Sequence, residues 1–199
     1  MGVWKALEFA GLAAGIGSIT WGALSFFVDP GRPDGRLRLV AGFAAAGFVN
    51  QAVETWRAAA ALPSTAVAVG LYLTALWLFW SAVRACASHR PAAIFTAGTP
   101  GSLVEGGPYR VLRHPFYASY ACFWLAGAIG TGAWTTWLAA IVMTAIYAGA
   151  AREEERAFAR SPFASRYAAY RRRTGITWPR PASRSALRER GAPASPTTR

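Results

Sequence analysis

The sequence predicts an all-α, polytopic integral membrane protein with about five transmembrane helices and a C-terminal interfacial helix on the cytoplasmic side. Of the 199 residues, 54% are hydrophobic, only 15% are charged, and nine are tryptophan. The apolar residues form runs close to the roughly 20 residues that a helix needs to cross a bilayer. No separate soluble domain is indicated by the composition.

Five apolar segments follow one another along the chain. They cover roughly residues 4–28, 39–62, 64–83, 116–129 and 134–150. The first three are long enough to span a membrane, whereas the last two are shorter and are separated only by residues 130–133, which predicts a tight helical hairpin. The first segment lacks a clear basic region and cleavage site, so we interpret it as a retained span.

The distribution of arginine predicts the orientation, because short cytoplasmic loops are enriched in basic residues. With five spans and a cytoplasmic C-terminus, the N-terminus lies outside. The predicted outer turns at 63–64 and 130–133 then carry no charge. The predicted inner loops contain Arg32, Arg36, Arg38, Arg84, Arg90, Arg110 and Arg113.

Most of the net charge of +12 lies near the C-terminus, where residues 151–199 contain twelve arginines and four glutamates. Residues 181–199 are rich in Pro, Ala, Ser and Thr, which predicts a disordered basic tail near anionic headgroups. A nucleic-acid-binding face would alternate these arginines with aromatic residues, so no nucleic-acid partner is expected.

The two cysteines, Cys86 and Cys122, are predicted near the end of one span and inside another, so we expect no structural disulfide. Cys86 and His89 resemble half of a metal site. No second pair at ligand spacing follows, and therefore no metal is expected.

Two further spacings are predicted to be structural. Glu54 and Arg57 are placed for a mutual pair on one helix, and Gly11 and Gly15 have the spacing that lets membrane helices pack closely.

Residues 107–117, Gly-Pro-Tyr-Arg-Val-Leu-Arg-His-Pro-Phe-Tyr, form a polar, turning segment that we call the cassette. Pro115 suits the first turn of the following helix, which places His114 at or beside the N-cap. Backbone N–H groups and the positive end of the helix dipole there favour an anionic or hydrogen-bond-accepting ligand. Position alone favours a plain helix-capping role for His114 and Pro115 as much as it favours ligand binding.

A second polar segment, residues 152–156, contains three consecutive glutamates directly after the fifth apolar segment. With a hairpin turn near Gly132 and a rise of about 1.5 Å per residue, His114 and Glu154 reach the same membrane edge. A carboxylate beside Arg113, His114 and two tyrosines would suit ribose hydroxyls or an ammonium group. Alternatively, the glutamates pair with neighbouring arginines along a solvated helix.

The chain beyond the glutamates predicts an interfacial helix that folds back over the site. Its aromatic positions are Phe158, Phe163, Tyr167 and Tyr170, with an interruption at Ser161-Pro162. Gly175 is expected to stop this helix, and Trp178-Pro179 to anchor it at headgroup level.

The order of these motifs resembles the isoprenylcysteine carboxyl methyltransferase family, which is related to the phospholipid N-methyltransferases. The cassette, a short apolar hairpin, Glu-Glu-x-x-Phe and then Tyr-x-x-Tyr-Arg-x-Arg-Thr-Gly with a nearby Trp-Pro carry the resemblance. The resemblance covers roughly residues 84–180 and implies a methyltransferase core there, while the three predicted N-terminal helices in 1–83 match only as generic membrane helices and 181–199 form the predicted tail. It also implies S-adenosylmethionine as cofactor and a bacterial setting; together with the orientation predicted from the arginines, this predicts a bacterial inner-membrane protein with the N-terminus outside and the C-terminus cytoplasmic.

The same resemblance implies site residues. The catalytic candidates are His114, Arg113 and Arg171. The implied cofactor-binding residues are Gly107, Tyr109, Arg113, His114, Pro115, Tyr117, Glu154, Glu155 and Tyr170. Glu153 adds a third acid, so which two acids face the ligand stays open, although the position of Phe158 favours Glu154 and Glu155.

The expected function is methyl transfer at the cytoplasmic face to a lipophilic acceptor: an isoprenylcysteine-like carboxylate, a phospholipid amine, a phenol or a thiol. A carboxylate acceptor needs only positioning, by Arg113 or Arg171, whereas an ammonium or phenol must lose a proton, for which His114 is the candidate base. The alternative is a non-enzymatic membrane protein whose basic tail recruits anionic lipid or a partner.

Overall fold

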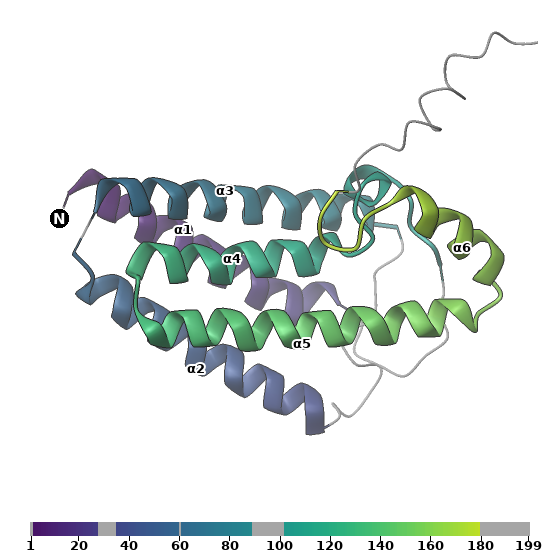
Figure 1. The fold of residues 1–199 in the computed structure, drawn as a ribbon, viewed down its shortest axis with the longest axis horizontal. Coiled ribbons are helices and arrows are strands. Elements are labelled where there is room, and N and C mark those ends of the chain that lie inside the picture. Colours follow the sequence, from purple (N-terminus) through teal and green to yellow (C-terminus); the bar gives the residue numbers. More distant parts are fainter. Residues whose placement is uncertain (1, 28–34, 60, 89–101, 180–199) are drawn as a thin grey trace, which may run out of the picture.

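The computed structural model describes residues 2–27, 35–59, 61–88 and 102–179, and these residues are helical apart from connecting segments and one isolated β-bridge (Figure 1). The elements are α1 (Val3–Trp21), the π-helical η1 (Gly22–Phe26), α2 (Gly35–Arg57), α3 (Leu62–Ala85), the 3-10 helix η2 (Gly107–Arg110), α4 (Pro115–Thr131), α5 (Trp134–Ala159) and α6 (Ala164–Arg173). A helix is present at each of the five predicted apolar segments. The predicted tail at 181–199 lies outside the described residues.

Among the described residues, three stretches are long and apolar enough to cross a membrane: Val3–Phe26, Leu62–Ala85 and Trp134–Ala159. The protein is therefore an integral membrane protein, but the predicted count of five spans is not confirmed. α4 has only 17 residues, fewer than the roughly 20 that a span needs. α2 is long enough but is less apolar, because it carries charged residues near both ends.

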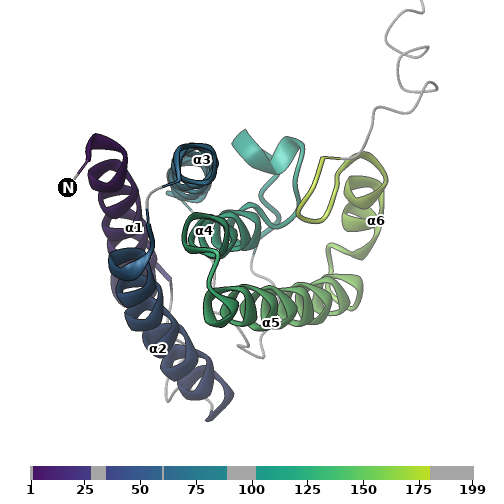
Figure 2. The ribbon, with the colours of Figure 1, turned by 60° about the vertical axis from the view of Figure 1, so that its left-hand side comes forward.

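Successive helices of the bundle run in opposite directions, and α4 lies at its centre, between α3 and α5 (Figures 1 and 2). Twelve of the 17 residues of α4 are buried. α1 and α2 lie on the other side of the bundle from α6 (Figure 2). Because α4 packs mainly against protein, it can be shorter than a lipid-facing helix.

Glycines allow α1 to approach its neighbours closely. A Cβ atom on Gly15 would lie 2.4 Å from Phe123 Cδ2, and one on Gly11 would lie 2.9 Å from Tyr72 Cβ. The predicted role of Gly11 and Gly15 in close packing is confirmed.

The predicted pair in α2 is also present: Arg57 Nη1 lies 3.6 Å from Glu54 Oε1.

The predicted hairpin between α4 and α5 is confirmed. Gly132 caps α4 in the left-handed conformation, with φ of 66°, and α5 starts at Trp134. However, α5 does not end near residue 150 as the apolar segment suggested. It continues to Ala159, because the glutamates and arginines that follow are good helix formers, and so the three acids stand on one long helix.

α6 folds back from the end of α5, as predicted (Figure 1). The turn is held by Ser161, whose hydroxyl donates to Phe158 O at 2.8 Å and accepts from Phe163 N at 3.1 Å. Gly175 follows the C-cap residue Thr174, but it lacks the left-handed conformation typical of a glycine helix stop. Gly175 instead forms the isolated parallel bridge with Leu112.

Candidate functional site

The cassette begins with a turn that requires glycine. Gly107 has a φ of +54°, and a Cβ atom there would lie 3.1 Å from Ala85 Cβ in α3. Cys86 Sγ donates to Tyr109 Oη at 3.4 Å. The close approach of Gly107 to Ala85 and the hydrogen bond between Cys86 and Tyr109 place η2 against the end of α3.

Residues 174–179, which we call the strap, are joined to the cassette by backbone hydrogen bonds. Arg113 N donates to Gly175 O at 2.7 Å, His114 N donates to Ile176 O at 3.0 Å, and Gly175 N donates to Val111 O at 2.9 Å. The backbone amide of His114 is therefore bound by the strap, although the sequence suggested that it would be available to a ligand.

His114 is the N-cap residue of α4 and Pro115 occupies its first turn, as predicted. The imidazole makes no capping hydrogen bond. Its Nδ1 lies 3.3 Å from Glu154 Oε2, while Nε2 lies 3.7 Å from Glu155 Oε1, beyond hydrogen-bond distance. The side chain is only 7% exposed, and Nε2 is buried without a hydrogen-bond partner among the described residues. His114 therefore does more than cap a helix.

Two of the three acids face the cassette. Tyr117 Oη donates to Glu154 Oε1, and Arg113 Nε donates to Glu155 Oε1 at 2.7 Å. Glu153 lies instead 3.7 Å from Arg36 Nη1 of α2, with both side chains at least half exposed. The structure thus brings Glu154 and Glu155 to the cassette and turns Glu153 away from it.

Arg113 connects α5, α6 and the strap. Besides its bond to Glu155, its Nη1 donates to Arg171 O at 3.2 Å and to Thr174 O at 2.5 Å. Its side chain is 7% exposed, so it is not a solvated positive anchor. Arg171 is half-exposed, and its Nη2 lies 3.8 Å from Glu155 Oε2.

We call the side chains of Arg113, His114, Tyr117, Glu154 and Glu155 the polar cluster. Burial of the imidazole opposes its charged form, but the nearby carboxylates of Glu154 and Glu155 favour that form more strongly, and the pKa of His114 is raised. His114 in the polar cluster therefore keeps its proton to a higher pH than a histidine in water does.

Tyr170 fastens α6 to the cassette. Its hydroxyl lies 2.7 Å from Tyr109 O and 3.2 Å from Leu112 O, both of which can accept its proton. Burial raises the pKa of Tyr170, so the hydroxyl remains a donor. The role that we observe for this hydroxyl is to position the backbone of the cassette.

Two tyrosines beneath the polar cluster were not among the predicted site residues. The ring of Tyr147 stacks on Tyr117 at 5.8 Å between centroids and lies 5.2 Å from Tyr120. Trp124 Nε1 donates to Tyr147 Oη at 3.2 Å. A signal was present in the sequence, since Tyr147 precedes Glu154 by two helical turns and so lies on the same face of α5.

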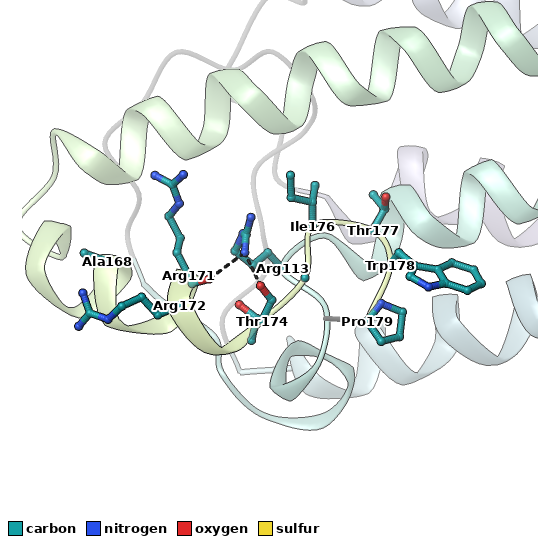
Figure 3. A pocket seen from close by; sticks show the side chains of 10 residues that line it. Arg113, Ala168, Arg171, Arg172, Thr174, Ile176, Thr177, Trp178 and Pro179 are labelled. Atoms are coloured by element: carbon teal, nitrogen blue, oxygen red, sulfur yellow. Dashed lines mark hydrogen bonds between the residues drawn. The ribbon is translucent and has the colours of Figure 1, made fainter. Parts of the chain in front are cut away.

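A pocket of about 590 Å³ lies beside the polar cluster, at the C-terminal end of α6 (Figure 3). It is lined by Arg113, Ala168, Arg171, Arg172, Thr174, Gly175, Ile176, Thr177, Trp178 and Pro179. The pocket touches the polar cluster only through Arg113.

Within the described part of the chain, no three His, Cys, Asp or Glu residues are grouped so that they could hold a metal ion. Cys86 and Cys122 are free thiols. His89, the second half of the metal pattern considered above, lies outside the described residues.

The fold and the polar cluster define an all-helical integral membrane protein with a polar site at one end of its bundle. The sequence model of the phospholipid methyltransferase family matches residues 63–166, just over half of the chain. The chain therefore belongs to this family and is a membrane methyltransferase. Comparison with curated proteins and with solved structures gives no match.

The match confirms the predicted resemblance, but it covers residues 63–166 instead of roughly 84–180. It begins at the start of α3, before residue 84, and it includes the cassette and the three acids. It ends within α6, so Tyr170, Arg171 and the strap lie beyond it. The alternative of recruitment by a basic tail concerns residues 181–199, outside the described residues.

Proposed function

We propose that this protein transfers a methyl group from S-adenosylmethionine to a lipophilic acceptor that reaches the polar cluster from the bilayer. The observation that carries the proposal is the convergence of the polar cluster: cassette side chains and two acids of α5 meet in a largely buried site at one end of a membrane bundle. When bound, S-adenosylmethionine supplies an electrophilic methyl group.

The residues present fit this cofactor. It carries two cationic groups and ribose hydroxyls, which carboxylates bind well. Glu154 is 42% exposed and so can be reached by a ligand, and the unpartnered Nε2 of His114 is a polar atom that a ligand group can satisfy. Gly107, Tyr109, Pro115 and Tyr170 then shape the loop and the cover of the cofactor site.

The chain's own groups have separate tasks in this proposal. α6 and the strap exclude water, and Arg113 holds Glu155 and the end of α6 in place. Neutral His114 takes up the proton that an ammonium or phenol acceptor must lose, and Glu154 and Glu155 stabilise the imidazolium that forms. Arg171, at the edge of the polar cluster, would contact the acceptor or its headgroup.

The charge of the polar cluster favours an acceptor that arrives with a proton. Glu155 is paired with Arg113, but the more exposed Glu154 would repel a carboxylate acceptor, whereas it attracts an ammonium and can accept a hydrogen bond from a phenol. We therefore favour a phospholipid amine or a lipophilic phenol, and the family match supports the former. An isoprenylcysteine-like carboxylate and a thiol are the weaker candidates.

We propose that the end of the bundle with the polar cluster faces the cytoplasm of a bacterial cell, with the N-terminus outside. The basic residues of the described cassette and of α6 lie at this end, and cytoplasmic membrane edges are rich in arginine. Residues 84–180 form the methyltransferase core in this proposal, and residues 1–83 support it in the membrane.

The first test is S-adenosylmethionine binding to detergent-solubilised protein by calorimetry. We expect His114→Ala and Glu154→Ala to weaken binding by about tenfold or more, since a charge-assisted hydrogen bond contributes about 1.5–3 kcal/mol. Glu153→Ala is the matched control, because this adjacent acid faces α2, and it should bind like wild type. Circular dichroism verifies folding. Absence of binding to folded wild type would contradict the proposal.

The second test is transfer of labelled methyl groups into a total lipid extract. Wild type should label a lipid, and Glu154→Ala should not. No labelled product would count against catalysis. If function instead survives Glu154→Ala but is lost on deletion of 181–199, recruitment by the tail is the better explanation.

A further inference from the structure

We propose that the pocket between the end of α6 and the strap binds the phosphate of an anionic membrane lipid, a second ligand whose site shares Arg171 with the proposed acceptor site. The proposal concerns a second ligand of the protein and does not depend on methyl transfer. It rests on three features of this pocket: its positive charge, the apolar side chains along one side, and the hydrogen-bonded carbonyls at the end of α6.

The pocket is strongly basic. Its lining includes Arg113, Arg171 and Arg172, and none of the described lining residues is acidic. Glu155, which does not line the pocket, lies 2.7 Å from Arg113 and 3.8 Å from Arg171, so one carboxylate is shared between two of these arginines. The lining therefore carries excess positive charge, and a phosphate is the common membrane group that arginine binds best.

The opposite side of the pocket is apolar. In Figure 3, Arg171 and Arg172 extend from α6 on one side, while Trp178 and Pro179 lie on the other. Trp178 is 82% exposed and Ile176 is 47% exposed. An exposed indole beside arginines is typical of the headgroup region of a membrane. A soluble anion would gain little from these side chains, whereas a lipid would contact them with its glycerol and upper acyl carbons.

The end of α6 is prepared for an anion. The C-terminal carbonyls of a helix carry partial negative charge and normally repel one. Here the carbonyls of Arg171 and Thr174 accept hydrogen bonds from Arg113 Nη1 at 3.2 and 2.5 Å. The guanidinium thus covers these oxygens and reduces their repulsion.

The same lining distinguishes between headgroups. An ammonium-bearing headgroup would place its positive charge among the arginines, whereas phosphatidylglycerol has none. We therefore expect phosphatidylglycerol to be preferred over phosphatidylcholine. A phosphate bound here would connect α6 with the strap and stabilise the cover of the polar cluster.

The test measures thermal unfolding of the full, detergent-solubilised chain with short-chain phosphatidylglycerol or phosphatidylcholine. Phosphatidylglycerol should raise the unfolding temperature more, because only binding to the folded state stabilises it. Arg171→Gln combined with Arg172→Gln should abolish the difference. Arg156→Gln combined with Arg160→Gln is the matched control, because these exposed arginines lie outside the pocket and the charge change is the same.

Three results would overturn the proposal. Equal stabilisation of wild type by both lipids would exclude selection for an anionic headgroup. Loss of the difference in the control variant would show a general charge effect. An equal effect of glycerol 3-phosphate would assign the pocket to a soluble anion. Trp178→Ala, which leaves the arginines in place, should weaken the lipid effect without altering the response to glycerol 3-phosphate.

Discussion

At the residue scale, the polar cluster is a set of charges that are tolerated because they are paired. Arg113 and Glu155 are 7% and 14% exposed and lie 2.7 Å apart, so removing either one leaves a largely buried charge without its partner. The exposed pair of Glu153 and Arg36, by contrast, contributes little to stability. Adjacent glutamates on one helix therefore have very different environments.

The raised pKa of His114 predicts a pH-dependent stability. Because its pKa in the folded chain lies above the usual 6.5, protonation of the ring stabilises the fold fully below that value. This contribution is lost as the pH rises through the raised pKa. Thermal unfolding in detergent between pH 5.5 and 9 should therefore show wild type losing stability relative to His114→Gln, which cannot titrate. Parallel pH profiles would contradict the interaction of His114 with Glu154 and Glu155.

At the scale of elements, two connections create the site. The continuation of α5 beyond the apolar segment brings Glu154 and Glu155 to the cassette. α6 then folds back along the bundle end, so that the strap lies next to the cassette and pairs with its backbone. Exposed ion pairs of Arg166 and Arg173 with Glu105 add to this closure. Each connection joins segments that are distant in sequence.

Two tyrosines of α6 provide a matched test of this closure. Tyr170→Phe removes a hydroxyl that bonds to the cassette backbone and should cost about 1 kcal/mol. The buried hydroxyl of Tyr167 has no hydrogen-bond partner in the described part of the chain, so Tyr167→Phe should be neutral or slightly stabilising. Hydrogen exchange of residues 164–173 should accelerate in the first variant only. Equal exchange in both variants would show that the Tyr170 hydroxyl does not hold α6.

At the scale of the whole molecule, the bundle places its polar site at the end opposite the N-terminus (Figure 1). The described basic groups of the cassette and α6 are gathered at that end. The three helices that can span a membrane surround a short, buried α4, so lipid and protein divide the task of covering the apolar surface. The membrane face at which the polar site lies therefore depends on how the whole bundle is inserted.

The proposed orientation predicts the accessibility of single cysteines. In a chain with Cys86 and Cys122 replaced by alanine, Ala61→Cys should react with a membrane-impermeant maleimide in intact cells. Ser165→Cys, in α6, should react only after permeabilisation, because the polar site faces the cytoplasm. Both positions are exposed in the fold. The reverse pattern would invert the proposed topology.

The sequence by itself determined the class of this protein, the five helical segments, the start of α4 at Pro115 and the motifs that mark the family. Hydrophobic segment length and proline position are local signals, so they can be read without the fold. Only the tertiary structure decided that Glu154 and Glu155 face the cassette while Glu153 faces α2, because the rotation of α5 depends on packing against α4. The inclusion of Tyr147 and the bonding of the strap to His114 also depend on long-range contacts. These contacts join residues that no local pattern relates.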